Sequence, residues 1–430
     1  MGAAIGIFLA LLLLGMPVAF AIGISGFAFF LIRDLPMSIL VQKSISTTQS
    51  FTMLAIPLFI LAGNLMNATG ITRRLMRLAS VLTGHMWGNI GQVSCVLSTL
   101  MGGVSGSAVA DAAMETRILG PEMMRLGYAR GWAAAVNGLS GLIVATIPPS
   151  MGLIIYGTVG EVSIGRLFMA GWVPGLLMMA LLMVATSWSA RYFGYKPEHA
   201  RPASLAEIGR ELVSAIWALL FPILLIVLIR FGIMSPSESG AFACAYALFV
   251  GAAVYRELTW PVLIQTLKDS VKDITVITII LCFSGVFGYG VVYDDLTTAI
   301  ATSLVALTSN STLLLFLVIL FLLLCGCFME TTVIALILTP ILLPVMQRVG
   351  VDPVVFGMIM MTTVTFGVMT PPVGTGLYAV SDIMGCSIQE TVRYGWPFYV
   401  AVLLVVAFMV FFPAAVLWLP NLVYGVAGTV

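Results

Sequence analysis

Long apolar runs separated by short polar connections dominate the chain. Five of them lie at 51–69, 170–190, 212–230, 274–292 and 396–418. A bilayer core about 30 Å thick is crossed by a helix of about 20 apolar residues. The strands of a membrane barrel instead alternate apolar and polar positions over about ten residues. The pattern therefore predicts an all-α polytopic membrane protein.

The runs at the start of each half are shorter. Residues 4–14 and 18–32 are apolar and are interrupted by Gly15, Met16 and Pro17. Because 212–229 and 241–255 form a similar pair, two short helices are favoured over one long tilted helix. Residues 33–50 are polar and are predicted to form a helix lying at the membrane interface.

Two later segments contain glycine-rich breaks. The first break, at 102–108, reads GGVSGSA, and the second, at 325–332, reads CGCFMETT. The arms beside the first break are each about twelve residues long, too short to cross separately. We therefore expect re-entrant helical hairpins at 89–120 and 312–345. A double proline follows each hairpin and is expected to break the spans at 131–158 and 354–380.

The two breaks belong to an internal duplication. Gly326 follows Gly103 by 223 residues, and six further identical pairs keep this offset: Pro121/Pro344, Arg125/Arg348, Gly127/Gly350, Pro148/Pro371, Pro149/Pro372 and Pro174/Pro397. Paired repeats with broken hydrophobic segments are a sequence mark of secondary transporters. Five spans in each repeat would make the second repeat inverted relative to the first.

Basic residues give the expected orientation, because they concentrate on the cytoplasmic side. Their distribution places the N-terminus outside and the 191–211 linker in the cytoplasm. The expected division is a scaffold part (1–69), a transport part (70–169), a span with the linker (170–211), a second scaffold part with the first transport span (212–292), a second transport part (293–395) and a last span (396–430).

Composition narrows the class of function. The chain has 430 residues, of which 60% are hydrophobic and 9% charged, and its mean hydropathy is +1.11. Soluble proteins carry about 25% charged residues. The 19 basic and 18 acidic residues give no basic surplus for binding nucleic acid. No span holds a catalytic Asp pair, a Ser–His dyad or an HExxH motif, so an enzyme is not expected, and the six cysteines form no CxxC pair.

Backbone breaks suit ion and anion binding. A helix that ends at a break leaves free carbonyl groups, which suit a hard cation such as Na⁺, and a helix that begins there leaves free N–H groups, which suit a carboxylate. The candidate Na⁺ ligands are Gly103, Ser105, Ser107, Pro148, Gly326, Thr331, Thr332 and Thr370. The candidate substrate-binding residues are Ser105, Gly106, Pro149, Ser150, Thr332 and Pro372. The alternative is that these small residues serve only close helix packing.

Acidic residues near the breaks allow two interpretations. Asp111, Glu115 and Arg117 either form a local pair near the interface or contribute a ligand. Glu330 lies in the second break, where its side chain either contacts a ligand or bonds loop amides. Asn137 is a lone polar residue in a span and is expected to bond a neighbouring helix.

Several of these segments resemble the large membrane subunit of tripartite ATP-independent periplasmic (TRAP) transporters. The similarity runs in colinear order through 103–111 (GVSGSAVAD), 120–128 (GPEMMRLGY), 147–157 (IPPSMGLIIYG), 235–241 (SPSESGA), 352–357 (DPVVFG) and 370–374 (TPPVG). At 325–327 the similarity to the family is loose.

The resemblance implies an elevator-type importer in the bacterial inner membrane. It implies coupling to two or more Na⁺ ions, a small membrane subunit, a periplasmic substrate-binding protein, and an organic acid substrate such as a sialic acid or a C4-dicarboxylate. The alternative is a stand-alone Na⁺/carboxylate symporter with the same kind of hairpins.

Overall fold

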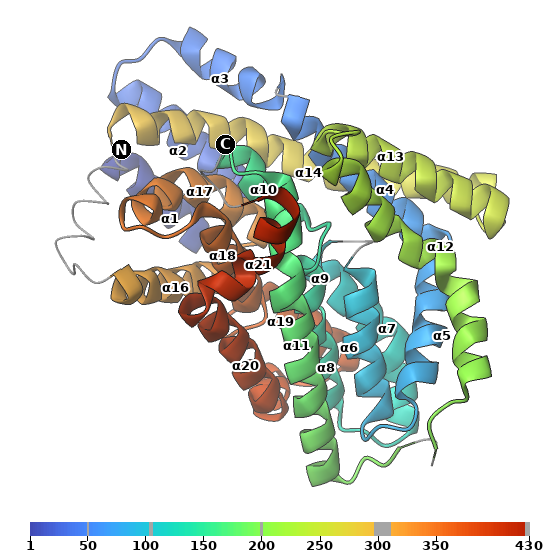
Figure 1. Ribbon diagram of the computed structural model, residues 1–430. Helices are drawn as coiled ribbons and strands as arrows, with labels where there is room; N and C mark the ends of the chain where they lie inside the picture. The colour runs from blue at the N-terminus through green and yellow to red at the C-terminus, as the bar shows by residue number, and fades with distance from the viewer. Residues whose placement is uncertain (50, 103–105, 198–200, 296–310, 426–430) are drawn as a thin grey trace.

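The computed structural model describes residues 1–49, 51–102, 106–197, 201–295 and 311–425, and all regular structure in these ranges is helical (Figure 1). By length and composition, seven described helices could cross a membrane, or up to nine if each of two bent pairs counts as one span. The prediction of an all-α polytopic membrane protein is confirmed.

The described residues of the first half form eleven α-helices and a short 3₁₀ helix. They are α1 (Gly2–Leu13), α2 (Val18–Ile32), α3 (Met37–Gln49), η1 (Phe51–Leu54), α4 (Ala55–Ala68), α5 (Ile71–Thr83), α6 (Asn89–Met101), α7 (Ala108–Arg125), α8 (Arg130–Ser140), α9 (Leu142–Thr146), α10 (Met151–Val159) and α11 (Ile164–Phe193).

The second half repeats this order. It comprises α12 (Leu205–Arg230), α13 (Pro236–Phe249), the π-helical turn η2 (Val250–Val254), α14 (Trp260–Tyr293), α16 (Ser311–Phe328), α17 (Thr331–Arg348), α18 (Pro353–Val368), α19 (Thr375–Met384), α20 (Ile388–Phe411) and α21 (Pro413–Tyr424).

Helix boundaries follow the duplication seen in the sequence. Helices α7 and α17 each have 18 residues, and their first residues, Ala108 and Thr331, are 223 positions apart. Helices α8 and α18 begin at the same offset, with Arg130 and Pro353. The double prolines interrupt the helices at equivalent places in both halves, as predicted.

Equivalent glycines follow the second arm of each hairpin. Gly127 and Gly350 have φ values of +79° and +83°, a conformation that glycine adopts without steric cost. Around Gly127, the Tyr128 N–H donates to the Met123 carbonyl over 3.0 Å, and Val351 and Met346 make the equivalent bond after Gly350. This is the Schellman arrangement, which satisfies carbonyls at a helix end.

Several predicted boundaries were wrong. The second arm of the first hairpin extends to Arg125 and that of the second hairpin to Arg348, because Pro121, Pro340 and Pro344 are accommodated inside helices. The first arm of the second hairpin also has 18 residues. The predicted span 170–190 belongs to a longer helix, α11, which begins after its Ser163 cap and continues through Pro174. The last span instead divides at Pro413 into α20 and α21.

Helix α5 carries a basic cluster, and helix α14 is longer than the predicted span. Arg73, Arg74 and Arg77 lie on α5, which buries Leu75, Leu78 and Ala79 on its other side. The predicted span 274–292 is the second part of α14, which begins at Trp260. Its counterpart in the first half is divided into α3, η1 and α4, so the two repeats differ here.

Helices pack in two groups that meet at a few places. Helices α2, α3, α4 and α13 pack with one another or with α14, and we call this group with α14 the scaffold helices. The two hairpins pack with α8–α11 and α18–α20. The groups touch where α4 contacts α10 and where α14 contacts α17 (Figure 1).

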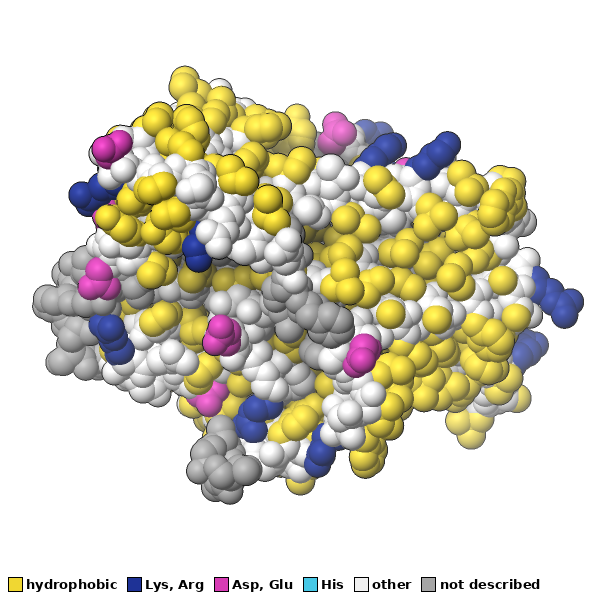
Figure 2. Space-filling view, turned by 90° about the horizontal axis from the view of Figure 1, so that it is seen from above, with side chains coloured by type: hydrophobic (Ala, Val, Ile, Leu, Met, Phe, Trp, Pro, Cys, Tyr) yellow, Lys and Arg dark blue, Asp and Glu magenta, His cyan; other side chains and the backbone are white. Residues whose placement is uncertain are grey.

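The outer surface is largely apolar. Figure 2 shows broad hydrophobic areas on one face with charged side chains scattered mainly toward its edges. Large apolar side chains such as Val184 and Leu320 are 65% and 56% exposed. Such a surface suits a bilayer rather than water as its solvent.

Candidate ligand cavity

The tip of the first hairpin packs on the first proline break. Gly106 has φ +68°, and a Cβ atom there would lie 3.0 Å from the Pro149 carbonyl oxygen and 3.2 Å from the Met151 nitrogen. A larger residue would push the tip away from the break. Glycine therefore brings Ser107 and the first turn of α7 close to the start of α10.

The second tip is bonded to the second proline break. The Gly374 N–H donates to the Cys327 carbonyl oxygen over 2.8 Å. A Cβ atom at Gly326 would lie 2.4 Å from the Val364 carbonyl oxygen, so α16 and α18 approach closely there. Each hairpin tip is thus held by the break of its own repeat.

The first break also meets the second tip. A Cβ atom at Gly152 would lie 3.5 Å from Thr331 Cγ2 and 2.3 Å from Met361 Cε. Thr331 Oγ1 lies 3.4 Å from Thr365 Oγ1 of α18. Elements from the two halves of the chain therefore share one site.

A cavity of about 310 Å³ lies at this junction. Such a volume is at the lower end of the range for small-molecule sites. Its polar wall comes from the first tip, the first break, the second tip, α18, α4 and α14, and its residues include Gly106, Ser107, Ser150, Glu330, Thr331, Thr332, Thr365, Asn64, Asn67 and Asp273.

Five of the predicted site residues line this cavity: Gly106, Ser107, Ser150, Thr331 and Thr332. Gly103 and Ser105 lie outside the described residues. Pro148, Pro149 and Gly326 are buried beside the cavity without lining it, while Pro372 is exposed. The Thr370 hydroxyl donates to the Phe366 carbonyl oxygen over 2.7 Å and is also outside the lining. The ligand roles assigned to all of these residues stay predictions.

Ser150 has a feature that points to a ligand. Its side chain is 1% exposed, and its hydroxyl oxygen has no hydrogen-bond partner among the described residues. A buried hydroxyl group without a partner costs free energy, so such groups are rare in folded proteins. The residue lines the cavity, so a bound molecule is the natural candidate for the missing hydrogen-bond partner of this hydroxyl.

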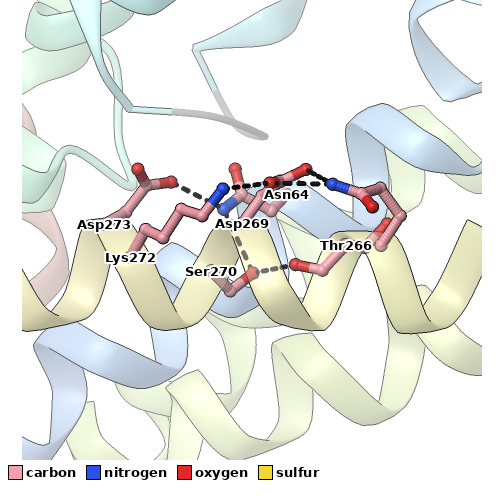
Figure 3. Close-up of polar contacts among 7 residues, drawn as sticks. Asn64, Thr266, Asp269, Ser270, Lys272 and Asp273 are labelled. Atoms are coloured by element: carbon pink, nitrogen blue, oxygen red, sulfur yellow. Dashed lines mark hydrogen bonds and ion pairs between the residues drawn. The ribbon is translucent and has the colours of Figure 1, made fainter.

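The scaffold helices contribute a polar wall that the sequence analysis missed (Figure 3). Asn64 Nδ2 donates to Asp273 Oδ2 over 3.0 Å and to Ser270 Oγ over 3.1 Å. One turn away on α14, Asp269 accepts from Gln265 and lies 3.7 Å from Lys272 Nζ. The signal in the sequence was the pair Asn64 and Asn67, two amides three residues apart at the end of an otherwise apolar span.

Glu330 caps α17 only by its position. It occupies the N-cap, but its side chain makes no capping hydrogen bond. The residue is exposed and lines the cavity together with Asp273 of the scaffold. Of the two predicted alternatives, a bond to loop amides is not found among the described residues.

The local pair expected near the interface for Asp111, Glu115 and Arg117 was wrong, and a ligand role of these residues stays a prediction. Asp111 and Glu115 are 1% and 0% exposed, whereas Arg117 is exposed. Glu115 instead accepts hydrogen bonds from three serines: Ser94 at 2.6 Å, Ser98 at 2.8 Å and Ser140 at 3.4 Å. The first hairpin therefore holds a polar interior closed by α8. Asn137 of α8 donates a hydrogen bond from its amide to the Met123 sulfur of α7, which agrees with the bond to a neighbouring helix expected for it.

The fold and the cavity together define a polytopic helical membrane protein of the permease class. Residues 5–415 match the family model described as "Tripartite ATP-independent periplasmic transporter, DctM component". The chain belongs to this family, which confirms the resemblance seen in the sequence.

Relatives of the chain are similar over almost their whole length. The sialic acid TRAP transporter large permease protein SiaM of Vibrio cholerae is 36% identical over 418 residues, covering 97% of each chain. The 2,3-diketo-L-gulonate TRAP transporter large permease protein YiaN of Escherichia coli is 34% identical, covering 95% of this chain and 97% of that protein. The C4-dicarboxylate TRAP transporter large permease protein DctM of Rhodobacter capsulatus is 32% identical, covering 97% and 98%.

A solved structure shares the fold. The YdaH transporter of Alcanivorax borkumensis, whose topology has been described as unusual, has a TM-score of 0.63 with 13% sequence identity. The similarity covers 88% of this chain and 89% of that one. The family model thus identifies the chain as a large permease component of a TRAP transporter, and the solved structure supports its fold.

Proposed function

We propose that the chain is the transport subunit of a Na⁺-coupled importer that takes up an organic acid. The observation that carries the proposal is the meeting of two helix N-termini at one cavity. The first residues of α7 and α17 line it from the two repeats. Free N–H groups and the positive dipole end of each helix favour a carboxylate there.

Neutral oxygens around the same cavity support a role for Na⁺. The hydroxyls of Ser107, Thr331 and Thr332 lie at the two tips, where the preceding arms also end in carbonyl groups. Hard cations prefer such oxygen ligands. Two or more Na⁺ ions bound at the tips would offset the negative charge of the substrate and couple its entry to the Na⁺ gradient.

The position of the cavity supports an elevator mechanism. The hairpins and broken helices form one wall, and α4 and α14 form the other. If the hairpin side moves across the bilayer against the scaffold helices, the cavity is carried from one face to the other. The contacts of α4 with α10 and of α14 with α17 are then the surfaces that slide.

Family membership supports two partners and the inner membrane as location. We propose that a small membrane subunit holds the scaffold helices and that a periplasmic binding protein delivers the substrate. A relative named isethionate TRAP transporter permease protein DctMQ, from Oleidesulfovibrio alaskensis, is longer, and the chain covers 64% of it. That extra length is consistent with a permease joined to another component.

Reconstitution tests the proposal. Proteoliposomes holding the chain and the small subunit, with the binding protein outside, should accumulate substrate only under an inward Na⁺ gradient. Leaving out either partner should abolish most uptake. Full uptake by the chain alone would favour the stand-alone symporter, and uptake without a Na⁺ gradient would contradict Na⁺ coupling.

A further inference from the structure

The cavity wall carries two acidic side chains and, among the described residues that line it, no basic one. Asp273 comes from the scaffold helix α14, and Glu330 comes from the tip of the second hairpin. All other polar side chains of the lining are neutral amides and hydroxyls. The side chains of the wall are therefore net negative, which is unexpected for a site that receives an anion.

Asp273 is held in place while its charge stays uncompensated. Asn64 Nδ2 donates to one of its carboxylate oxygens, and Asn64 is itself anchored on Ser270. The neighbouring Lys272 points to Asp269 instead, one turn back on α14 (Figure 3). The described residues contain no ion pair to Asp273.

Glu330 faces the cavity from the hairpin side, opposite the scaffold helix that carries Asp273. Its side chain makes no capping hydrogen bond to α17, and it lines the cavity together with Asp273. Repulsion between like charges is strong where water is scarce and the effective dielectric constant is low. A ligand that brought a second negative group to this side of the cavity would meet both carboxylates.

We infer, on the function proposed above, that the cavity selects a polyhydroxylated acid with one carboxylate and excludes dicarboxylates. The single carboxylate lies at the N-terminus of α7, beside Ser150. The rest of the molecule faces Asp273 and Glu330, which as carboxylates only accept hydrogen bonds. Hydroxyl donors satisfy them, whereas a second carboxylate has no donor to offer.

A matched pair of sugar acids tests this inference on the purified full-length chain. D-Gluconate and D-glucarate differ only in the terminal carbon, a hydroxymethyl group in the first and a carboxylate in the second. Binding is measured by calorimetry and by thermal stabilisation in NaCl, with choline chloride at equal ionic strength as reference. We expect gluconate to bind at least about tenfold more tightly than glucarate, and only in Na⁺.

The double variant Asp273→Asn/Glu330→Gln should remove most of this discrimination. The amide introduced at position 273 keeps an oxygen that accepts from Asn64, and the amide introduced at position 330 breaks no capping bond, so the fold is preserved. Asp269→Asn removes the same charge one turn away on α14, outside the cavity lining, and should leave the preference unchanged.

The outcomes separate this inference from the proposed function. Three results would overturn the inferred selectivity for polyhydroxylated monocarboxylates. Glucarate binds as tightly as gluconate in Na⁺, the double variant keeps the preference for gluconate, or neither acid binds. The proposed Na⁺ coupling fails on a different result, namely a chain whose stability and ligand binding are the same in NaCl and choline chloride.

Discussion

The two hairpins have the same backbone plan in different surroundings. Helix α6 packs against α5, α8, α9 and α11 and buries polar groups such as Gln92, Ser94 and Ser98. Helix α16 packs mainly on α18 and exposes a row of apolar side chains: Leu313, Leu317, Leu320, Phe321, Leu324 and Phe328. The first hairpin is enclosed by protein, whereas the second presents one arm to the outside.

This difference shows that the glycine breaks determine where a hairpin turns. The environment of each arm, protein or lipid, determines whether its side chains are polar or apolar. Both hairpins turn at a break with glycine and end their second arm at a glycine with positive φ. Inside protein, buried hydroxyl and carboxyl groups find partners and are tolerated. An arm that faces lipid cannot satisfy such groups, so it is apolar.

The largest expected effect is at the buried carboxyl of the first hairpin. Glu115→Leu removes the carboxylate acceptor of the Ser94 and Ser98 hydroxyls, whereas Ser140 keeps the Asn137 carbonyl oxygen, and the expected cost is about 4 kcal/mol in stability. Glu115→Gln keeps one acceptor oxygen and should cost clearly less. The measurement is the unfolding midpoint of the solubilised chain, and equal midpoints for the two variants would contradict the hydrogen-bonded cluster.

A smaller effect distinguishes the two sides of α16. Leu322 is fully buried, and Leu322→Ala should cost about 3 kcal/mol through the cavity it leaves. Leu320, two residues earlier, is 56% exposed, and Leu320→Ala should cost less than about 1 kcal/mol. If the two substitutions destabilise the chain equally, α16 is covered by another element or partner rather than by lipid.

The smallest expected effect is on the Na⁺ dependence of uptake in variants of the two hairpin tips. Ser107→Ala and Thr331→Ala each remove one hydroxyl from the cavity and should raise the Na⁺ concentration for half-maximal uptake by up to about tenfold. Ser80→Ala is the control, because the Ser80 hydroxyl bonds the Met76 carbonyl on α5, outside the cavity. An unchanged Na⁺ dependence in both tip variants would support the packing role of these residues.

The breaks and the repeat were predictable because glycine, serine and proline have strong local effects. Five residues placed at the site from sequence, Ser107 and Thr331 among them, do line the cavity. Asn64 and Asp273 were missed because their convergence depends on how α4 packs on α14. The burial of Glu115 was also not visible, since its partner Ser140 belongs to a different segment, α8. The orientation in the membrane stays a prediction.

The central claim is that one cavity between the two hairpin tips and the scaffold helices binds the substrate with Na⁺. An electron cryo-microscopy map of the chain with its small subunit, in saturating Na⁺ and D-gluconate, tests it directly. We predict density for the carboxylate at the N-terminus of α7 within hydrogen-bonding distance of Ser150, with the hydroxyls toward Asp273. Ligand density elsewhere, with this cavity empty, would contradict the claim.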